Sequence, residues 1–546
     1  MTDNHDSMWA TLAQDSLRFE QEMDPLYRKQ TGSYYTALEL AYAMMQEMIV
    51  GLSEVDKKLI YKKKFLEPCV GTGNFVYAYL RVCKSLHFTS EQYKELINNI
   101  YACDINSGAL AIYKRNLTRY VQYLFHISLD DSYFSTHLGT GLMIDVNEEE
   151  PRYIAITDIF PSEVVGSGFD FVVTNPPYKN LKAERGHYQT SGQYHGDKDK
   201  YTKISQLAAH QFSFSSVGTL NLYKLFVEEI IERYTAPNGT CSLLIPSSIL
   251  SDKTCSKLRT RLLETCSLKS LRIIAETSNY VDASQALCAM LLTKGGRTSD
   301  VYIDGSYAGD IHHGTTVSIE KILDSSTGNA ILVLAPEEYT IRKKMQESPA
   351  IKEIPYIANL RGELDITLNK ASIVMEKTPY TLYRGRHVGY YHINELPQKE
   401  YVDVSFVHST AKERFIHSQR LICPQIANMA KKRRVSFALV PPESVLGNSC
   451  NFISVDENED GVDYYFLLGV LNSQLMDWFF KLTSSNNHIN NYEIDHFPIP
   501  IHYEGKPKIS ELVRRYLEAP SEEILVRIEE LVKQAYGILP LEKKGR

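Results

Sequence analysis

Hydrophobic and polar positions follow two different periods along the first half of the chain. Short runs of β-branched and aromatic residues, typical of buried strands, alternate with amphipathic stretches of helical period. The predicted strands are 64–66, 100–103, 153–157, 169–174, 241–245, 270–274 and 286–292, and the predicted helices are 74–85, 106–124, 220–234 and 252–265. This alternation predicts an α/β fold, a Rossmann-like doubly wound sheet that is mainly parallel and carries helices on both faces.

The pattern changes after the turn-rich segment GGRTSD at residues 295–300. Beyond it the sequence predicts short, irregular strands and two late helices, at 464–481 and 508–536. We therefore predict a domain boundary between residues 295 and 320, with one domain at 1–300 and a second, mixed α+β domain at 301–546.

Composition narrows the class of protein. A length of 546 residues excludes a single small module. The chain has 59 basic and 66 acidic side chains, a net charge of −7, and 43% of its residues are hydrophobic, which is typical of a folded globular protein. No apolar run is long enough for a membrane span and the amino terminus is acidic, so we expect a cytoplasmic protein. The nine cysteines show no two-residue spacing, which predicts reduced, mostly buried thiols and no metal site.

The segment KFLEPCVGTGNF, residues 64–75, has the pattern of a strand, an acidic residue, a glycine turn and a helix. Gly71 and Gly73 permit a tight turn and a close approach of the backbone to a ligand, and the helix that begins near Asn74 directs its N–H groups into the cleft. An ordinary structural turn is the alternative. Val76 stands where a dinucleotide fingerprint has its third glycine, which disfavours a nicotinamide or flavin enzyme.

Acidic residues also follow the next predicted strands. Asp104 ends the strand IYACDIN, where an acid accepts hydrogen bonds from ribose hydroxyls in an open α/β sheet. Asp158 and Phe160 end the predicted strand YIAITDIF, where they would contact an adenine amino group and cover its ring. Helix caps and a core aromatic are the alternative interpretation. Together with the glycine turn, these positions favour a nucleoside site.

The fourth predicted strand, FDFVVTNPPY, ends in Asn175, Pro176, Pro177 and Tyr178. Two successive prolines hold an extended turn and leave carbonyl groups free to face a ligand. The exocyclic amine of adenine is a poor nucleophile until two acceptors bind its N–H groups; the Asn175 side-chain oxygen and the Pro176 carbonyl would supply them, and Tyr178 would stack on the ring. A simple proline turn is the alternative.

These motifs, in this order, resemble those of the γ-class N6-adenine DNA methyltransferases, which use S-adenosylmethionine. QTGSYYT (30–36) is similar to the amino-terminal cofactor motif of that family, and GTLNLYKLF, IPSSIL and NYVDASQALCAMLL to its later motifs, so the resemblance spans residues 30–295. It implies a cofactor site formed by Tyr35, Thr36, Glu67, Pro68, Gly71, Gly73, Asp104, Asp158, Phe160 and Asn175. It also implies a catalytic group of Asn175, Pro176, Pro177 and Tyr178, with Tyr178 and Tyr280 stacking on the target base; for Tyr280, a buried core position is the alternative.

The second half resembles the target-recognition domains of the same family and of Type I specificity subunits. The similar segments are RGELDITLNK, YRGRHVGYY, LLGVLNSQLMDWFF and FPIP. Residues 401–450 carry seven basic and three acidic side chains, a local charge of +4, centred on Lys431, Lys432, Arg433 and Arg434. We interpret these four residues, and Lys179 in a basic loop at 179–203 that could close over DNA, as DNA-binding; a solvated loop is the alternative in both places.

The resemblance thus implies a site-specific DNA adenine-N6 methyltransferase that flips its target base and protects host DNA in a restriction-modification or phage-defence system. The expected cofactor is S-adenosylmethionine. The expected partner is double-stranded DNA, beside a separately encoded effector, with no membrane contact, and we expect a monomer or weak dimer. The alternative activities are glutamine-N5 methylation of a protein and guanine-N2 methylation of RNA. Because the segment before Gln30 is short, we expect no fused nuclease domain there, and the intact NPPY speaks against an inert scaffold.

Overall fold

The chain folds into two compact units, Met1–Leu334 and Ala335–Arg546. The computed structural model describes residues 3–24, 32, 34–141, 143–145, 151–183, 191–274, 281, 286–304, 314–324, 328–394, 398–428, 431–484 and 487–538. The first unit ends at Leu334 rather than near residue 300 because the sheet continues: β10 (Asp300–Asp304) pairs with β8 (Cys266–Ile274), and β11 (Thr315–Ser318) pairs with β10.

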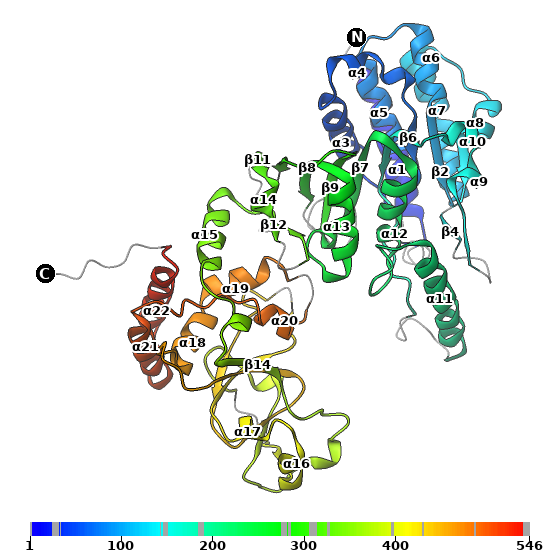
Figure 1. Ribbon diagram of the computed structural model, residues 1–546. Coiled ribbons are helices and arrows are strands. Elements are labelled where there is room, and N and C mark those ends of the chain that lie inside the picture. The colour runs from blue at the N-terminus through cyan, green and yellow to red at the C-terminus, as the bar shows by residue number, and fades with distance from the viewer. Residues whose placement is uncertain are drawn as a thin grey trace, which may run out of the picture. The chain divides into compact units, whose positions relative to one another are not determined.

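A nine-stranded sheet forms the centre of the first unit (Figure 1). Its order is β11-β10-β8-β9-β7-β6-β1-β2-β3, and all neighbours from β3 to β7 are parallel, whereas β9 runs antiparallel between β7 and β8. The remaining strands of the unit are β1 (Phe65–Glu67), β2 (Ile100–Asp104), β3 (Leu138–Thr140), β4 (Ile144–Asp145), β5 (Arg152–Tyr153), β6 (Phe169–Thr174), β7 (Thr235–Pro246), β9 (Leu287–Lys294), β12 (Leu323–Asp324) and β13 (Ala330–Ile331). The predicted doubly wound α/β fold is confirmed.

The strand order reverses between β1 and β6. The chain proceeds outward from β1 through β2 to β3 and then returns to the other side of β1 to form β6. Ligands of open α/β sheets bind at such a switch point, beyond the carboxyl ends of the strands. Glu67 ends β1 and Thr174 ends β6, so the glycine turn and the NPPY segment both begin at this point.

Helices cover the sheet, and α1, α3, α5 and α7 pack on one another beside it (Figure 1). The helices of the unit are α1 (Asp3–Glu22), α3 (Leu38–Val50), α4 (Glu54–Lys58), α5 (Asn74–Lys84), α6 (Ser90–Asn98), α7 (Ser107–Phe125), α8 (Asp131–His137), α9 (Ile156–Ile159), α10 (Ser162–Val165), α11 (Ser191–Gln211), α12 (Leu222–Glu229), α13 (Ser256–Thr265) and α14 (Ile319–Ile322). Local caps set several starts: Asn106 accepts hydrogen bonds from the N–H groups of Gly108 and Ala109 where α7 begins. No helix in the described part of the chain is long and apolar enough to cross a membrane.

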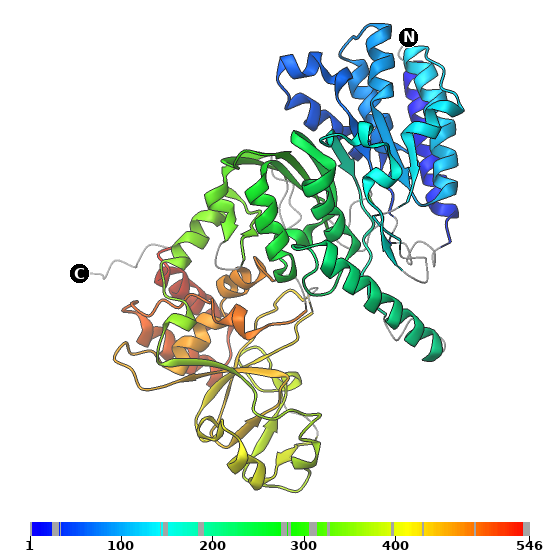
Figure 2. The ribbon, with the colours of Figure 1, turned by 45° about the vertical axis from the view of Figure 1, so that its right-hand side comes forward.

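Two predicted elements were wrong, and a third, a predicted helix, is confirmed with a change of helix type in its last turn. The third parallel strand is β3, not 153–157, because Ile156–Ile159 forms the helix α9, whose Asp158 accepts a hydrogen bond from the Ala155 N–H. The predicted loop 179–203 contains most of helix α11, which extends away from the sheet in both views (Figure 1, Figure 2). The helix predicted at 220–234 is α12 followed by a π-helical turn at Ile230–Tyr234.

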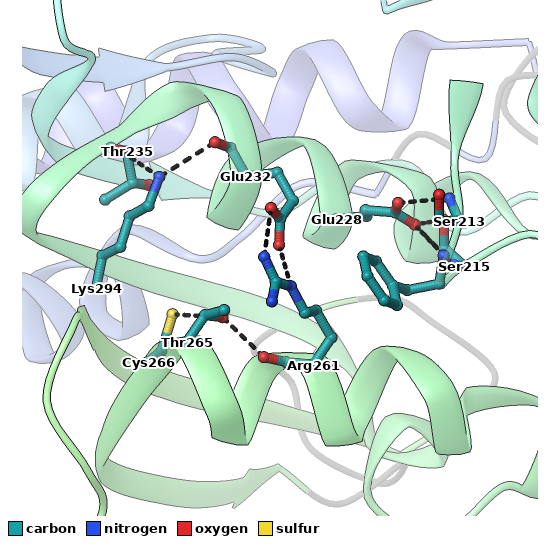
Figure 3. A network of polar contacts seen from close by, with 10 residues as sticks. Ser213, Ser215, Glu228, Glu232, Thr235, Arg261, Thr265, Cys266 and Lys294 are labelled. Atoms are coloured by element: carbon teal, nitrogen blue, oxygen red, sulfur yellow. Dashed lines mark hydrogen bonds and ion pairs between the residues drawn. The ribbon is translucent and has the colours of Figure 1, made fainter.

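Polar contacts fix the end of α12 and the turn that follows it to neighbouring segments (Figure 3). The Glu228 carboxylate accepts hydrogen bonds from the N–H groups of Ser213, Phe214 and Ser215, and from the Ser215 hydroxyl. One turn later, Glu232 receives two hydrogen bonds from Arg261, at 2.7 and 3.0 Å. Glu228 thus fixes the loop before GTLNLYKLF, and Glu232 fixes α13 to the turn after α12.

The second unit is a mixed α+β structure, as predicted. It contains two four-stranded sheets, β14-β21-β18-β19 and β15-β17-β16-β20. Its strands are β14 (Ile357–Arg361), β15 (Ile373–Val374), β16 (Thr381–Tyr383), β17 (Tyr401–Val402), β18 (Arg420–Pro424), β19 (Ala438–Val440), β20 (Ser444–Leu446) and β21 (Cys450–Val455). Its helices are α15 (Pro336–Gln346), α16 (Val404–Ser409), α17 (Glu413–Ile416), α18 (Tyr464–Leu471), α19 (Gln474–Lys481), α20 (Asn491–Ile494), α21 (Lys506–Glu518) and α22 (Glu522–Ala535).

Each of the two predicted late helices is a pair of helices. The break between α18 and α19 falls at Asn472, whose buried amide exchanges two hydrogen bonds with the backbone of Phe437, and Ser473 then caps α19. Ser521 likewise caps α22 after α21 has ended at Glu518. Hydrophobic period alone does not reveal such breaks, because both halves continue the same apolar face.

A fully buried ion pair joins the two sheets of the second unit. Glu363, in the RGELDITLNK segment, binds Arg420 at the start of β18, and both side chains are completely buried. The other Glu363 oxygen accepts the Leu446 N–H at 2.8 Å, and Arg420 also donates to the Ser444 carbonyl, both in β20. This segment of the recognition-domain resemblance therefore has a structural role.

Candidate active site

The glycine turn after β1 is constrained by its neighbours. Gly71 and Gly73 adopt φ values of +53° and +105°, a region that favours glycine. A Cβ atom on Gly71 would lie 2.8 Å from the Tyr35 ring, and one on Gly73 would lie 2.5 Å from the Tyr113 ring. Because the backbone passes so close to these rings, glycine is required at both positions.

Asp104, at the end of β2, holds this turn in place. One carboxylate oxygen accepts the Gly71 N–H at 2.8 Å and the other accepts the Asn106 N–H, also at 2.8 Å. Burial raises the pKa of Asp104, and the two backbone hydrogen bonds oppose that shift. Each oxygen keeps a further lone pair, so Asp104 organises the turn and remains able to accept a ligand hydroxyl.

The Asn175 amide has a fixed orientation. Its Nδ2 donates to the Tyr34 carbonyl at 2.9 Å and to the Thr36 hydroxyl at 3.0 Å. Its Oδ1 accepts the Tyr178 hydroxyl, which also lies 2.9 Å from the Leu244 carbonyl. Since both N–H groups are used, the free hydrogen-bonding capacity of the Asn175 side chain is a lone pair on Oδ1.

Tyr178 is packed more tightly than the sequence suggests. Its side chain is 8% exposed, and its ring stacks on Tyr34 with centroids 5.7 Å apart and an interplanar angle of 20°. Burial raises the pKa of the Tyr178 hydroxyl well above its ordinary value, so it stays protonated and able to donate. The ring that was predicted to stack on a base therefore stacks on Tyr34 in this structure.

A cavity that is open to solvent lies at the switch point. It is lined by Tyr34, Tyr35, Thr36, Cys69, Val70, Gly71, Thr72, Asn74, Phe75, Asp104, Ile105, Asn175 and Pro177. Three sequence-distant motifs thus meet at one cavity: the YYT segment, the glycine turn and the NPPY turn. Burial raises the pKa of Cys69 well above its ordinary value, which disfavours a nucleophilic thiolate among these residues.

Unpartnered buried polar atoms lie around the start of the glycine turn. Glu67 is 1% exposed, and neither of its carboxylate oxygens has a hydrogen-bond partner in the described structure. Asn74 Oδ1 and the Thr174 hydroxyl likewise have none among the described residues. Burial raises the pKa of Glu67 well above its ordinary value, although polar interactions with the Thr174 side chain and the Cys69 backbone oppose this shift. Such atoms cost folding free energy, which suits a site that a ligand with hydrogen-bond donors completes.

The predicted site residues divide into those that line the cavity and those that do not. Tyr35, Thr36, Gly71, Asp104, Asn175 and Pro177 line it, whereas Glu67, Pro68, Gly73, Pro176 and Tyr178 are buried beside these residues. Tyr280 lies outside the described residues. The roles of these residues toward a ligand stay predictions.

Asp158 and Phe160 do not end a strand, which corrects the expectation for both. Asp158 is exposed on α9, and its carboxylate accepts the Ala155 N–H at 2.9 Å. Phe160 is 2% exposed and packs edge-on against Tyr101 and Phe169. Neither residue is among those that line the cavity, and a contact of either with a ligand stays a prediction.

The predicted run of DNA-binding residues is not one exposed patch. Lys431 and Lys432 are exposed, but Arg433 lies over the Tyr390 ring and donates to the Asn472 carbonyl at 2.7 Å. Arg434 is 3% exposed, donates to the Ser484 hydroxyl at 2.9 Å and lies over the Phe480 ring. Arg434 is therefore a core residue, because its neighbours fold over it.

Lys179, the remaining predicted DNA contact, is half-buried directly after the NPPY turn. Its ammonium lies 5.8 Å from the centre of the Tyr201 ring on α11, and burial lowers its pKa. Its carbonyl accepts the Leu222 N–H at 2.9 Å, which ties it to the start of α12. A contact of Lys179 with DNA stays a prediction.

The sequence interpretation missed the support given by α1. Ser16 on this helix exchanges a hydrogen bond with Thr72 at 2.7 Å and accepts one from Asn74, and Asn74 also donates to the Thr36 carbonyl. Phe19 packs edge-on against Tyr35. The helical spacing of Trp9, Leu12, Ser16 and Phe19 was the available signal.

Comparison with known proteins agrees with this geometry. Residues 98–279 match the Eco57I restriction-modification methylase family, and residues 380–499 match the TaqI-like C-terminal specificity domain. The chain therefore combines a restriction-modification methylase region with a C-terminal specificity region, which confirms the predicted class of a methyltransferase with a C-terminal recognition domain.

Two solved structures share the fold of the chain. The Type IIL restriction-modification enzyme MmeI in complex with DNA has a TM-score of 0.52 and 12% identity, over 97% of this chain and 79% of that one. A nuclease-deletion mutant of the Type ISP restriction-modification enzyme LlaGI, in complex with a DNA substrate mimic, has a TM-score of 0.51 and 12% identity, over 90% of this chain and 55% of that one. A search of curated proteins gave no match.

Proposed function

We propose that the protein is a site-specific DNA methyltransferase that transfers a methyl group from S-adenosylmethionine to the N6 atom of a flipped adenine. The observation that carries this proposal is the Asn175 amide, whose two N–H groups are both engaged and whose oxygen keeps one lone pair beside the cavity. An amide held in this way accepts a hydrogen bond from a substrate amine and cannot turn to donate one.

The amine of adenine needs such an acceptor. Its lone pair is delocalised into the ring, and hydrogen bonds to oxygen atoms favour the tetrahedral nitrogen that attacks a methyl group. The Asn175 oxygen and the Pro176 carbonyl are the proposed acceptors, and the Tyr178 hydroxyl keeps the Asn175 oxygen in position. This chemistry relies on positioning and on hydrogen bonds that strengthen as charge develops on nitrogen.

The residues around the cavity fit S-adenosylmethionine, which when bound supplies an electrophilic methyl group. Asp104 and the unpartnered Glu67 carboxylate suit a ligand rich in hydroxyl and ammonium donors, and the glycine turn brings its backbone close to the cavity. Thr36 and Phe75, which line the same cavity, would hold the remainder of the cofactor. The specificity region at 380–499 supports DNA over a protein or RNA substrate.

Extrusion of the base and protection of host DNA complete the proposal. An adenine amine is hidden in a duplex, so an enzyme that methylates it requires the nucleotide to leave the stack, at a cost of a few kcal/mol. A restriction or phage-defence effector encoded separately would then cleave DNA that lacks the modification. The expected location is the cytoplasm.

The test is expression in a host without adenine methylation, followed by sequencing that detects N6-methyladenine. We expect modification at one sequence motif, and none after Asn175→Ala. Asn98→Ala, an exposed asparagine at the end of α6, is the matched control and should leave the modification unchanged. Methyl transfer to a protein glutamine or to RNA guanine, with unmodified DNA, would refute the proposal.

A further inference from the structure

A short β-ribbon is exposed in the second unit. Residues 425–428 and 487–489 form it, and we call it the exposed ribbon. Ile426 and His488 are an antiparallel bridge pair, and hydrogen bonds from the Ala427 N–H to the Asn487 carbonyl and from the Ile489 N–H to the Gln425 carbonyl, both 2.8 Å, flank this pair.

The two faces of the exposed ribbon differ. Ala427 and Ile489 are buried, with 2% and 1% exposure, whereas Ile426 is 63% exposed. Directly paired residues of an antiparallel ribbon project to the same face, so His488 stands beside Ile426 on the outer face. A large apolar side chain is thus presented to solvent next to an imidazole.

The exposed ribbon is held rigidly from beneath. The buried Asn451 amide donates to the Ile489 carbonyl at 2.7 Å and accepts a hydrogen bond from the Gln425 side chain at 3.1 Å. The buried Arg434 reaches the Ala427 carbonyl at 3.4 Å. A single exposed apolar residue is ordinary on a protein surface. Here, however, the buried polar hydrogen bonds fix the backbone that carries Ile426.

Two exposed cations lie at the end of the exposed ribbon. The Lys431 N–H donates to the Asn428 carbonyl at 3.1 Å, which keeps Lys431 close to the ribbon. The Lys432 carbonyl accepts a hydrogen bond from the Lys481 ammonium at 2.6 Å, which fixes the backbone there. Positive charge therefore lies beside the exposed ribbon.

We propose that the exposed ribbon reads base pairs in the major groove of duplex DNA, with Ile426 against the 5-methyl group of a thymine and Lys431 and Lys432 on neighbouring phosphates. This inference rests on the proposed function. A two-stranded ribbon fits the major groove, and the thymine methyl is the apolar feature that the groove displays. A phosphate backbone complements the two lysines.

The test begins with the wild-type protein and a duplex library of random sequence, which defines the methylated motif. Each thymine of that motif is then replaced by deoxyuridine, which keeps the base-pairing groups and removes the methyl group. We expect one such replacement to slow methylation by the wild-type protein about fourfold, the factor for one buried methyl group. Ile426→Ala should show this loss on unmodified DNA and no further loss on the deoxyuridine duplex, and Ile426→Val a smaller one.

Two controls separate the possible results. Val526→Ala removes an apolar residue of similar exposure, 51%, from α22 and should change neither the rate nor the motif. Replacing both Lys431 and Lys432 with glutamine should reduce the slope of log affinity against log salt by about 0.9 per lysine.

Different experimental results would overturn the ribbon inference and the proposed function. A wild-type protein that methylates duplex DNA, together with an Ile426→Ala variant that has the same rate, motif and response to every deoxyuridine, would overturn the ribbon inference alone. An inactive wild-type protein on every duplex would overturn the proposed function and the inference with it.

Discussion

Replacing Glu67 with glutamine should stabilise the ligand-free protein, and more strongly as the pH rises. The wild-type carboxyl is 1% exposed, its oxygens have no partners among the described residues, and burial raises its pKa well above 4.5. A carboxyl with a raised folded-state pKa contributes its full stability below the unfolded pKa and loses it as the pH rises through the folded one. Glutamine does not titrate and avoids this loss.

The magnitude follows from the pKa difference. Each pH unit between the unfolded and the folded pKa of Glu67 costs the wild-type protein about 1.4 kcal/mol of unfolding free energy. Three such units, from pH 4.5 to pH 7.5, set an upper limit of about 4 kcal/mol on the difference between variant and wild type at pH 7.5. The difference between variant and wild type should be constant below pH 4.5 and grow above it.

The assay is urea denaturation at several pH values, followed by the fluorescence of Trp9 in a Trp478→Phe background. The chain has two tryptophans, so Trp9 on α1 then reports on the first unit alone. Glu228→Gln is the matched control: this carboxylate is 3% exposed but accepts four hydrogen bonds (Figure 3), so its loss should destabilise the protein by about 1–3 kcal/mol.

Two results would refute this reasoning about Glu67. One is a stability difference that does not vary between pH 4.5 and pH 8, which would mean that the carboxyl titrates normally. The other is a loss of stability as large as that of Glu228→Gln. Calorimetry with S-adenosylmethionine then tests the proposed role separately, since a cofactor-binding Glu67 predicts weaker binding by the more stable variant.

Three further variants test other parts of the structure. Tyr178→Phe removes the hydrogen bond to Asn175 and should lower the methylation rate about two- to tenfold with little change in KM; an unchanged rate would leave Tyr178 as a packing residue. Gly73→Ala forces a side chain into the left-handed region and should lower the unfolding free energy by about 1–3 kcal/mol in the same urea assay, whereas Gly196→Ala, with open space around it, should not. Arg434→Met should lower the thermal midpoint, because it removes buried hydrogen bonds. A variant that loses DNA affinity with an unchanged thermal midpoint would instead support Arg434 as a DNA contact.

The elements that local pattern defines were predicted well. The strand β6, at 169–174, was placed to the residue, and α5 to within one residue, because a buried strand and an amphipathic helix each leave a clear period in the sequence. The third strand was missed because β3 is three residues long and contains Gly139. The alternation in YIAITDIF resembled a strand, but the Asp158 cap favours a helical turn there.

The candidate site also combines features that the sequence predicts with features that it does not. The glycine turn and the NPPY turn can be recognised in the sequence because each is formed by consecutive residues. The stacking of Tyr34 on Tyr178 and the unpartnered oxygens of Glu67 arise only when segments more than a hundred residues apart meet at the switch point. No spacing in the sequence records which hydrogen-bond partners a buried carboxylate lacks.

Local net charge was the sequence feature that predicted the structure least well. The count of +4 over residues 401–450 treats every arginine as exposed, yet Arg420 is fully buried against Glu363 and Arg434 is nearly so. A buried arginine stabilises the fold through its hydrogen bonds and adds little to the surface potential that attracts DNA. Of the seven basic side chains counted, Arg414, Lys431 and Lys432 are exposed, and the two lysines lie beside the exposed ribbon. Salt dependence of DNA binding should respond to these two lysines, while the arginines that follow them control stability.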